Sequence, residues 1–100
     1  MNRIEIRGVI VSSDFDAPYF STYIERGVIT PESRARLALA PLQHGDEVDI
    51  YVNSPGGFVF AGNEILNAIN DAVARGVRVT ITVGAYAASI AAAIVAQARG

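Results

Sequence analysis

The sequence has no cysteine and no lysine, and each absence excludes a class of chemistry. Without cysteine there are no disulfides, zinc-thiolate sites or thiol nucleophiles, a composition compatible with the cytoplasm. Without lysine the chain cannot by itself form a Schiff base or a serine-lysine dyad. Its eight basic residues are all arginines, spread from Arg3 to Arg99, and the net charge is -2. We therefore expect no nucleic-acid partner, because no basic cluster is available to bind phosphates.

Charge is also scarce, since charged residues make up only 18% of the chain and hydrophobic residues 51%. This balance is too apolar for intrinsic disorder, so a packed core is expected. A chain of 100 residues is long enough for one domain and too short for two ordinary ones. We therefore treat residues 1–100 as a single domain.

No targeting or membrane segment is predicted. The amino-terminal residues alternate between apolar and charged types and lack the continuous apolar run of a secretory signal. The uncharged stretch Val79–Ala98 is long enough to span a bilayer. Its first part alternates like a half-buried strand, and the rest is mostly alanine, which favours insertion only weakly. We expect no membrane span and a cytoplasmic protein.

The first forty residues predict one strand and one helix. Apolar residues alternate over Ile4–Val11, with Gly8 as a bulge. The stretch Tyr19–Val28 gives no clear assignment. A helix follows, with Thr30 as its N-cap and Pro31 at its first position, and it ends shortly before the next proline.

The second half predicts a strand, a helix, a second strand and a second helix. Val48–Asn53 is rich in β-branched residues and short enough for a strand. From about Phe60 to Arg75 the apolar residues fall on one helical face that includes Val73, and a glycine then ends the helix. A strand is expected over Val77–Val83. After Asn53 the sequence thus predicts the helix Phe60–Arg75, the strand Val77–Val83 and an alanine-rich helix from about Tyr86 to Ala98.

The strand, helix, strand order from Val48 to Val83 predicts two parallel strands and an α/β fold. In parallel sheets, ligands bind outside the carboxyl ends of the strands. The loops at those ends are Ser54-Pro55-Gly56-Gly57 and Gly84-Ala85-Tyr86-Ala87-Ala88-Ser89. Neighbouring strands lie about 4.8 Å apart, so we expect both loops to reach one small ligand.

These loops contain the groups needed for acyl transfer, apart from a base. The paired glycines, Gly56 and Gly57, leave backbone N–H groups open to a substrate oxygen. Ser89 is a candidate nucleophile at the start of a helix, whose dipole favours developing negative charge. The N–H of Ile90 is the second candidate donor to an oxyanion. His44, the only histidine, is expected at the opposite end of the sheet and therefore out of reach.

Simpler interpretations exist for each of these residues. Pro-Gly-Gly after a strand is often only a turn, and a serine in an alanine-rich helix is often only a packing residue. Ser54, which precedes a proline, is more simply a restricted turn residue than a nucleophile. The acids Asp46, Glu47 and Asp49 are more simply solvated than part of a cation site. We expect no metal and no cofactor.

Tyr51-Val52-Asn53-Ser54-Pro55-Gly56-Gly57, Ala61-Gly62 and Ala87-Ala88-Ser89 together resemble the Clp protease proteolytic subunit, ClpP, and the ClpP/crotonase fold. The resemblance runs from about Val48 to Ala98. It implies a serine endopeptidase in which Ser89 is the nucleophile and the N–H groups of Gly57 and Ile90 form the oxyanion hole. It also implies a peptide or protein substrate, a homo-oligomeric ring and an AAA+ unfoldase partner.

The same resemblance implies that the chain holds only the first half of a catalytic domain. In that family the triad histidine and aspartate follow the helix after the serine, so the base is expected from outside residues 1–100. The spacing from Gly84 to Ser89 is closer to that of SppA-type signal peptide peptidases, and the alanine-rich serine motif is similar to phage head maturation proteases. Three alternatives stay open: one of these peptidases, a crotonase-like acyl-CoA enzyme, or an inactive truncated subunit or scaffold.

Overall fold

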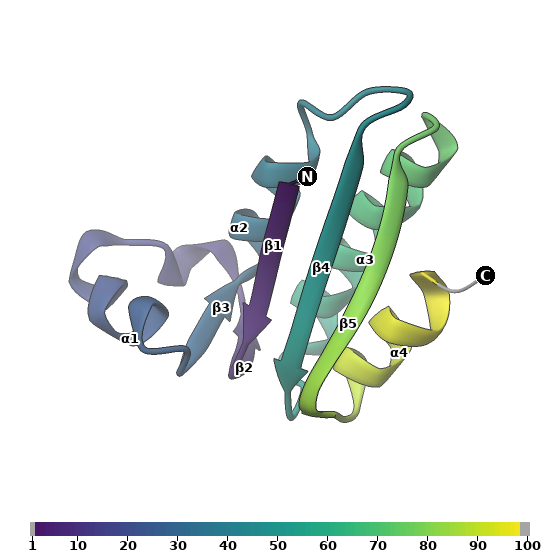
Figure 1. Ribbon diagram of the computed structural model, residues 1–100. Coiled ribbons are helices and arrows are strands. Elements are labelled where there is room, and N and C mark those ends of the chain that lie inside the picture. The colour runs from purple at the N-terminus through teal and green to yellow at the C-terminus, as the bar shows by residue number, and fades with distance from the viewer. Residues whose placement is uncertain (1, 99–100) are drawn as a thin grey trace.

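Parallel strands form the centre of the protein, whose computed structural model describes residues 2–98 (Figure 1). The larger sheet has three strands in the order β1, β4, β5, and both neighbouring pairs are parallel. A smaller parallel sheet pairs β2 with β3. The strands are β1 (Asn2–Arg7), β2 (Val9–Val11), β3 (Ile29–Pro31), β4 (Glu47–Ser54) and β5 (Arg78–Ala87), and the main helices are α2 (Glu32–Leu39), α3 (Val59–Ala74) and α4 (Ile90–Ala98).

The three helices share one hydrophobic core with one face of the larger sheet. In β4 every second residue is fully buried, as the period of two in a strand requires, and β1 alternates in the same way. Helix α3 contributes Ile65 and Ile69, and α4 contributes Ile94. The fold is therefore α/β with parallel strands, as predicted.

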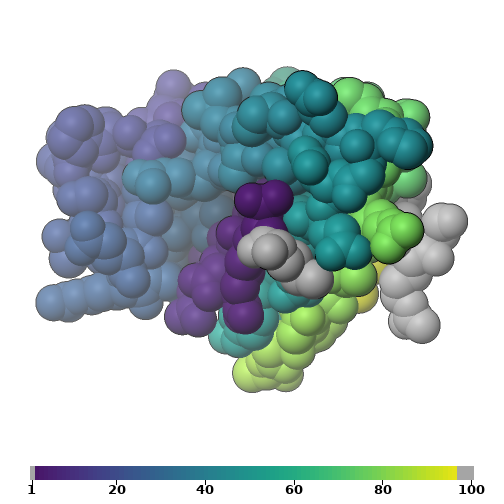
Figure 2. Space-filling model, turned by 45° about the horizontal axis from the view of Figure 1, so that its top comes forward, coloured from purple at the N-terminus to yellow at the C-terminus, as the bar shows by residue number. Residues whose placement is uncertain are grey.

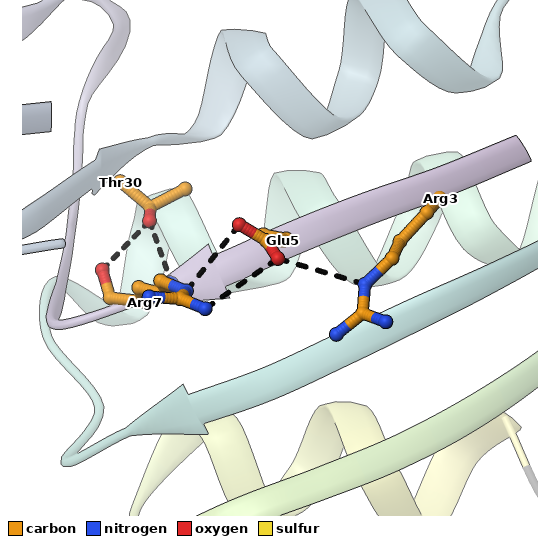
Figure 3. Close-up of polar contacts among 4 residues, drawn as sticks. All are labelled: Arg3, Glu5, Arg7 and Thr30. Carbon is orange, nitrogen blue, oxygen red and sulfur yellow. Dashed lines mark hydrogen bonds and ion pairs between the residues drawn. The ribbon is translucent and has the colours of Figure 1, made fainter. Parts of the chain in front are cut away.

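The opposite face of the sheet carries polar side chains. The Glu5 carboxylate forms ion pairs with Arg3 at 3.5 Å and with Arg7 at 3.3 Å (Figure 3). Both guanidinium groups lie over the ring of Tyr51, at 4.9 and 5.2 Å from its centroid. Each of these contacts is solvent-exposed and contributes little stability, so their main effect is to keep this face hydrophilic.

The first predicted strand is in fact two strands that belong to different sheets. Gly8 separates them with φ 66, and a Cβ atom there would lie 2.2 Å from the carbonyl oxygen of Val28. β1 before it pairs with β4, whereas β2 after it pairs with β3. The prediction of one bulged strand was wrong because tertiary pairing, which local propensity does not report, redirects the chain at this glycine.

The prediction that Thr30 caps a helix was also wrong. Thr30 lies in β3, where its hydroxyl accepts a hydrogen bond from the Arg7 N–H at 2.8 Å and donates one to the Arg7 carbonyl at 2.7 Å (Figure 3). Pro31 is the last strand residue and stands before α2, with extended backbone and no side-chain cap. The helix ends at Leu39, before the next proline as predicted.

Residues 12–28, which include the stretch Tyr19–Val28 that gave no clear assignment, form three short helical elements in a lobe beside the sheet (Figures 1 and 2). The Asp16 carboxylate joins this lobe to α2, because it accepts hydrogen bonds from the Ser33 hydroxyl and the Arg34 guanidinium, both at 3.0 Å. The lobe contains η1 (Ser13–Phe15), η2 (Pro18–Phe20) and α1 (Ser21–Glu25).

The predictions for the second half need two corrections. Val73 is 50% exposed, so it does not belong to the buried face of α3. β5 continues to Ala87, and α4 begins only at Ile90 rather than near Tyr86. The Asn53 side chain explains the longer strand, because its amide oxygen accepts hydrogen bonds from the N–H groups of Ala85 and Tyr86. Among the described residues, no helix has both the length and the apolar character needed to cross a bilayer.

Candidate active site

The two loops selected from the sequence meet at one edge of the larger sheet. β4 ends at Ser54 and β5 at Ala87, and the Ala88 N–H donates to the Ser54 carbonyl at 3.1 Å. A Cβ atom on Gly56 would lie 2.8 Å from Cβ of Ser89 and 3.3 Å from its Oγ. The first loop therefore contacts the Ser89 side chain. This agrees with the prediction, made from the parallel arrangement of the strands, that the two loops lie together.

Ser89 has an unusual backbone conformation. It has φ 55 and is the one non-glycine residue with positive φ among residues 2–98. This left-handed conformation costs an L-residue about 1–2 kcal/mol, and such strain gathers at functional sites. The residue is exposed and occupies the sharp turn between β5 and α4. A strand, a strained serine and a helix in succession also describe the nucleophile elbow of α/β-hydrolases.

The N–H of Gly57 is held on a fixed backbone segment beside β2. The Ile10 N–H donates to the Gly56 carbonyl at 2.9 Å, and the Phe58 N–H donates to the Ile10 carbonyl at 2.9 Å. A Cβ on Gly57 would lie 2.2 Å from the Ile10 oxygen, so a side chain does not fit. Within residues 2–98 the Gly57 N–H itself donates no hydrogen bond.

The N–H of Ile90 is open for a different reason. Ile90 is the first residue of α4, and N–H groups in a first helical turn have no partner inside the helix. Over the described part of the chain this N–H has no other acceptor either. A Cβ on Gly62 would lie 2.1 Å from Cγ1 of Ile90, so the close approach of α3 fixes the position of this residue.

Ser54 stabilises the first loop and is not exposed. Its hydroxyl is fully buried, donates to the Gly8 carbonyl at 2.6 Å and accepts from the Gly56 N–H at 3.0 Å. It therefore joins the end of β1 to the glycine pair. The sequence treated Ser54 only as a turn residue, and neither this link nor the Gly62–Ile90 contact was predicted, because both depend on residues distant in the chain.

His44 lies at the amino end of the sheet, beside Gly76 and just before β4. The 8 residues of β4 separate that end from Ser89, which at about 3.3 Å per residue is more than 20 Å. His44 is thus too far from Ser89 to act as its base.

The three acids that follow His44 in the sequence each contact a neighbouring group. Asp46 accepts from the Gln43 N–H, Glu47 pairs with Arg78, and Asp49 accepts from two threonine hydroxyls.

Comparison with known proteins gives one family. The family model described as Clp protease matches residues 25–100, which is most of the chain. No curated protein and no solved structure matches. The matched segment contains both loops of the candidate site and excludes β1, β2 and most of the lobe over residues 12–28.

Proposed function

The chain belongs to the Clp protease family, and from this premise we propose that it is a serine endopeptidase that uses Ser89 as its nucleophile. At the level of the family it is a ClpP-like peptidase. The serine mechanism and the roles of individual residues are our proposal.

In the proposed reaction the Ser89 hydroxyl attacks the carbonyl carbon of a peptide bond while a base takes its proton. The N–H groups of Gly57 and Ile90 hold the oxyanion, and Gly56 supports the loop. Collapse of the intermediate releases the amine, which takes up the proton, and leaves an acyl-enzyme that water hydrolyses. Loss of one oxyanion donor typically lowers the rate by about a hundredfold to a thousandfold.

A single observation carries this proposal: Ser89, strained and exposed, lies against Gly56 at the start of α4. A packing serine gains nothing from a left-handed backbone, whereas a nucleophile gains exposure and nearby N–H groups. The base is supplied from outside residues 1–100, because the one histidine lies at the far end of the sheet and the chain has no lysine.

Fluorophosphonate labelling of the full-length protein, followed by peptide mapping, tests the nucleophile. We expect modification of Ser89 and none of the buried Ser54, which serves as the matched internal control. The variant Ser89→Ala should abolish labelling. If the folded full-length protein stays unlabelled, the serine mechanism is wrong. The crotonase-like alternative, which would use the paired N–H groups on a thioester, would then be favoured.

We further propose a homo-oligomeric ring that acts on peptide or protein substrates, with an AAA+ unfoldase as partner, in the cytoplasm. Two features support an assembly. Within residues 2–98, β5 has a strand partner on only one side, and uncovered edge strands are normally paired or protected. Ala92, Ala93 and Ala96 in α4 also expose an apolar surface. Sedimentation analysis of the full-length protein tests the ring.

A further inference from the structure

A cluster of aromatic side chains lies next to the candidate active site. Four of its rings come from the lobe over residues 12–28, and the fifth comes from the segment that carries the candidate oxyanion donor. We call it the aromatic cluster. Its members are Phe15, Tyr19, Phe20, Tyr23 and Phe58.

The rings contact one another in an unbroken series. Phe58 stands edge-on to Phe15, with centroids 6.3 Å apart, and Phe15 lies 5.0 Å from Phe20. Phe20 in turn contacts Tyr19 at 4.4 Å and Tyr23 at 6.5 Å. Three of these separations lie within the range of about 4.5–7 Å that is favourable for aromatic pairs, and the Tyr19–Phe20 separation is slightly shorter. The cluster is thus one continuous surface that extends from Phe58 to the two tyrosines.

The outer rings of this surface are open to solvent, and Phe15 and Phe20 between them are half-buried. Tyr19 is 79% exposed, Tyr23 52% and Phe58 50%, and none of the three short helical elements of the lobe contains a buried residue. Exposed aromatic groups that build no core are typical of binding surfaces. The lobe is nevertheless held in place, because Asp16 bonds to both Ser33 and Arg34 of α2.

The aromatic cluster is continuous with the candidate site. Phe58 directly follows Gly57, and its backbone N–H is bonded to Ile10, so the ring starts one residue from the candidate oxyanion donor. We take the substrate rather than a second copy of the chain as the occupant of the cluster, because the cluster begins one residue from the donor that a substrate carbonyl must reach.

Four of the five aromatic residues precede residue 25, where the family match begins. The cluster therefore belongs mainly to a part of the chain outside the matched segment. It adds to the candidate site a surface that the match to the family does not account for.

We propose that the aromatic cluster binds aromatic and aliphatic side chains of the peptide substrate at positions away from the bond that is cleaved. This inference rests on the proposed peptidase function and adds a substrate class to it. An extended peptide advances about 3.3 Å per residue, so it crosses from Phe58 to Tyr19 in at most about five residues. The preferred substrates thus carry an apolar segment within about five residues of the scissile bond.

Fluorescence anisotropy tests the proposal on full-length Ser89→Ala protein, in which the proposed cleavage cannot occur. Two fluorescein-labelled peptides are compared that differ only in a Phe-Leu-Tyr segment replaced by Ser-Gly-Ser. We expect Tyr19→Ser to weaken binding of the apolar peptide about fivefold, as loss of one aromatic contact predicts, and to leave the polar peptide unaffected. Tyr19→Phe should restore affinity, and Leu37→Ser, which removes a 60% exposed apolar side chain on α2, should change nothing.

Other outcomes overturn the inference. Equal affinity for the two peptides, or no effect of Tyr19→Ser on the apolar one, would show that the cluster does not select substrates. If Tyr19→Ser instead shifts the protein to smaller species in sedimentation and leaves the peptide affinity unchanged, the cluster is a contact between copies of the chain. These results are separate from the proposed function, because fluorophosphonate labelling reports on Ser89 alone: labelling without peptide discrimination refutes only the substrate class, and discrimination without labelling refutes only the mechanism.

Discussion

Substituting alanine for Gly56 tests whether the two loops touch, and Gly45 provides a matched control. Both glycines have left-handed backbones, with φ 105 and φ 91. A Cβ on Gly45 would meet nothing within 4 Å, whereas a Cβ on Gly56 would lie 2.8 Å from Cβ of Ser89 and 3.0 Å from the Ala88 carbonyl oxygen. The two variants therefore share the backbone strain and differ in the contact with the serine turn.

The expected losses of stability follow from these distances. Gly45→Ala should lower the free energy of unfolding by about 1–2 kcal/mol, the cost of a left-handed L-residue. Gly56→Ala should lose a further 1–3 kcal/mol or so, the usual cost of overpacking, because one of its close contacts is a backbone atom that cannot rotate away. It should also slow fluorophosphonate labelling of Ser89, which Gly45→Ala should leave unchanged.

Urea denaturation followed by far-ultraviolet circular dichroism measures both losses, since the chain has no tryptophan to report unfolding. The slope of the transition serves as a check that both variants unfold in the same way. Equal losses for the two variants, within about 0.5 kcal/mol, would mean that Gly56 and Ser89 are not in contact. The geometry of the candidate site would then be wrong.

Three further tests of the same region also use denaturation. Ser89→Gly should be about 1 kcal/mol more stable than Ser89→Ala, because glycine adopts positive φ without strain; equal stability would contradict the strained turn. Ser54→Ala should lose about 1–3 kcal/mol, because it leaves the Gly8 carbonyl and the Gly56 N–H without their buried partner; a loss below 0.5 kcal/mol or so would argue against that link. Gly62→Ala should lower the free energy of unfolding by about 1–2 kcal/mol in the wild type, but by nothing in a protein that already carries Ile90→Ala, because the side chain it would strike is then gone. If the two substitutions prove additive in this double-mutant cycle, α3 does not pack closely on α4 at this point.

Local sequence patterns were sufficient for β4 and α3. β4 and α3 match their predicted ranges to within one residue at each end, because a run of β-branched residues and an apolar helical stripe are signals carried by the segment itself. The order of strand, helix and strand was likewise enough to place Ser89 and the paired glycines at the same edge of the sheet. That inference needed only the short connections and parallel pairing of such units.

The errors occur where a distant partner outweighs a local preference. Thr30 and Pro31 have the local features of a helix start, yet β2 and the backbone of Arg7 keep them in a strand. The Asn53 amide likewise extends β5 past Gly84 and delays α4 until Ile90. No periodicity within either segment reports these contacts.

The sequence by itself determined the composition, the α/β class and the identity of the residues in the candidate site, since all of these follow from residue types and their spacing. Only the tertiary structure decided the left-handed turn at Ser89, the buried bonds of Ser54 and the aromatic surface next to Phe58. The physical reason is that each of these depends on atoms from segments far apart in the chain, whose approach is set by packing of the whole core rather than by the preferences of neighbouring residues.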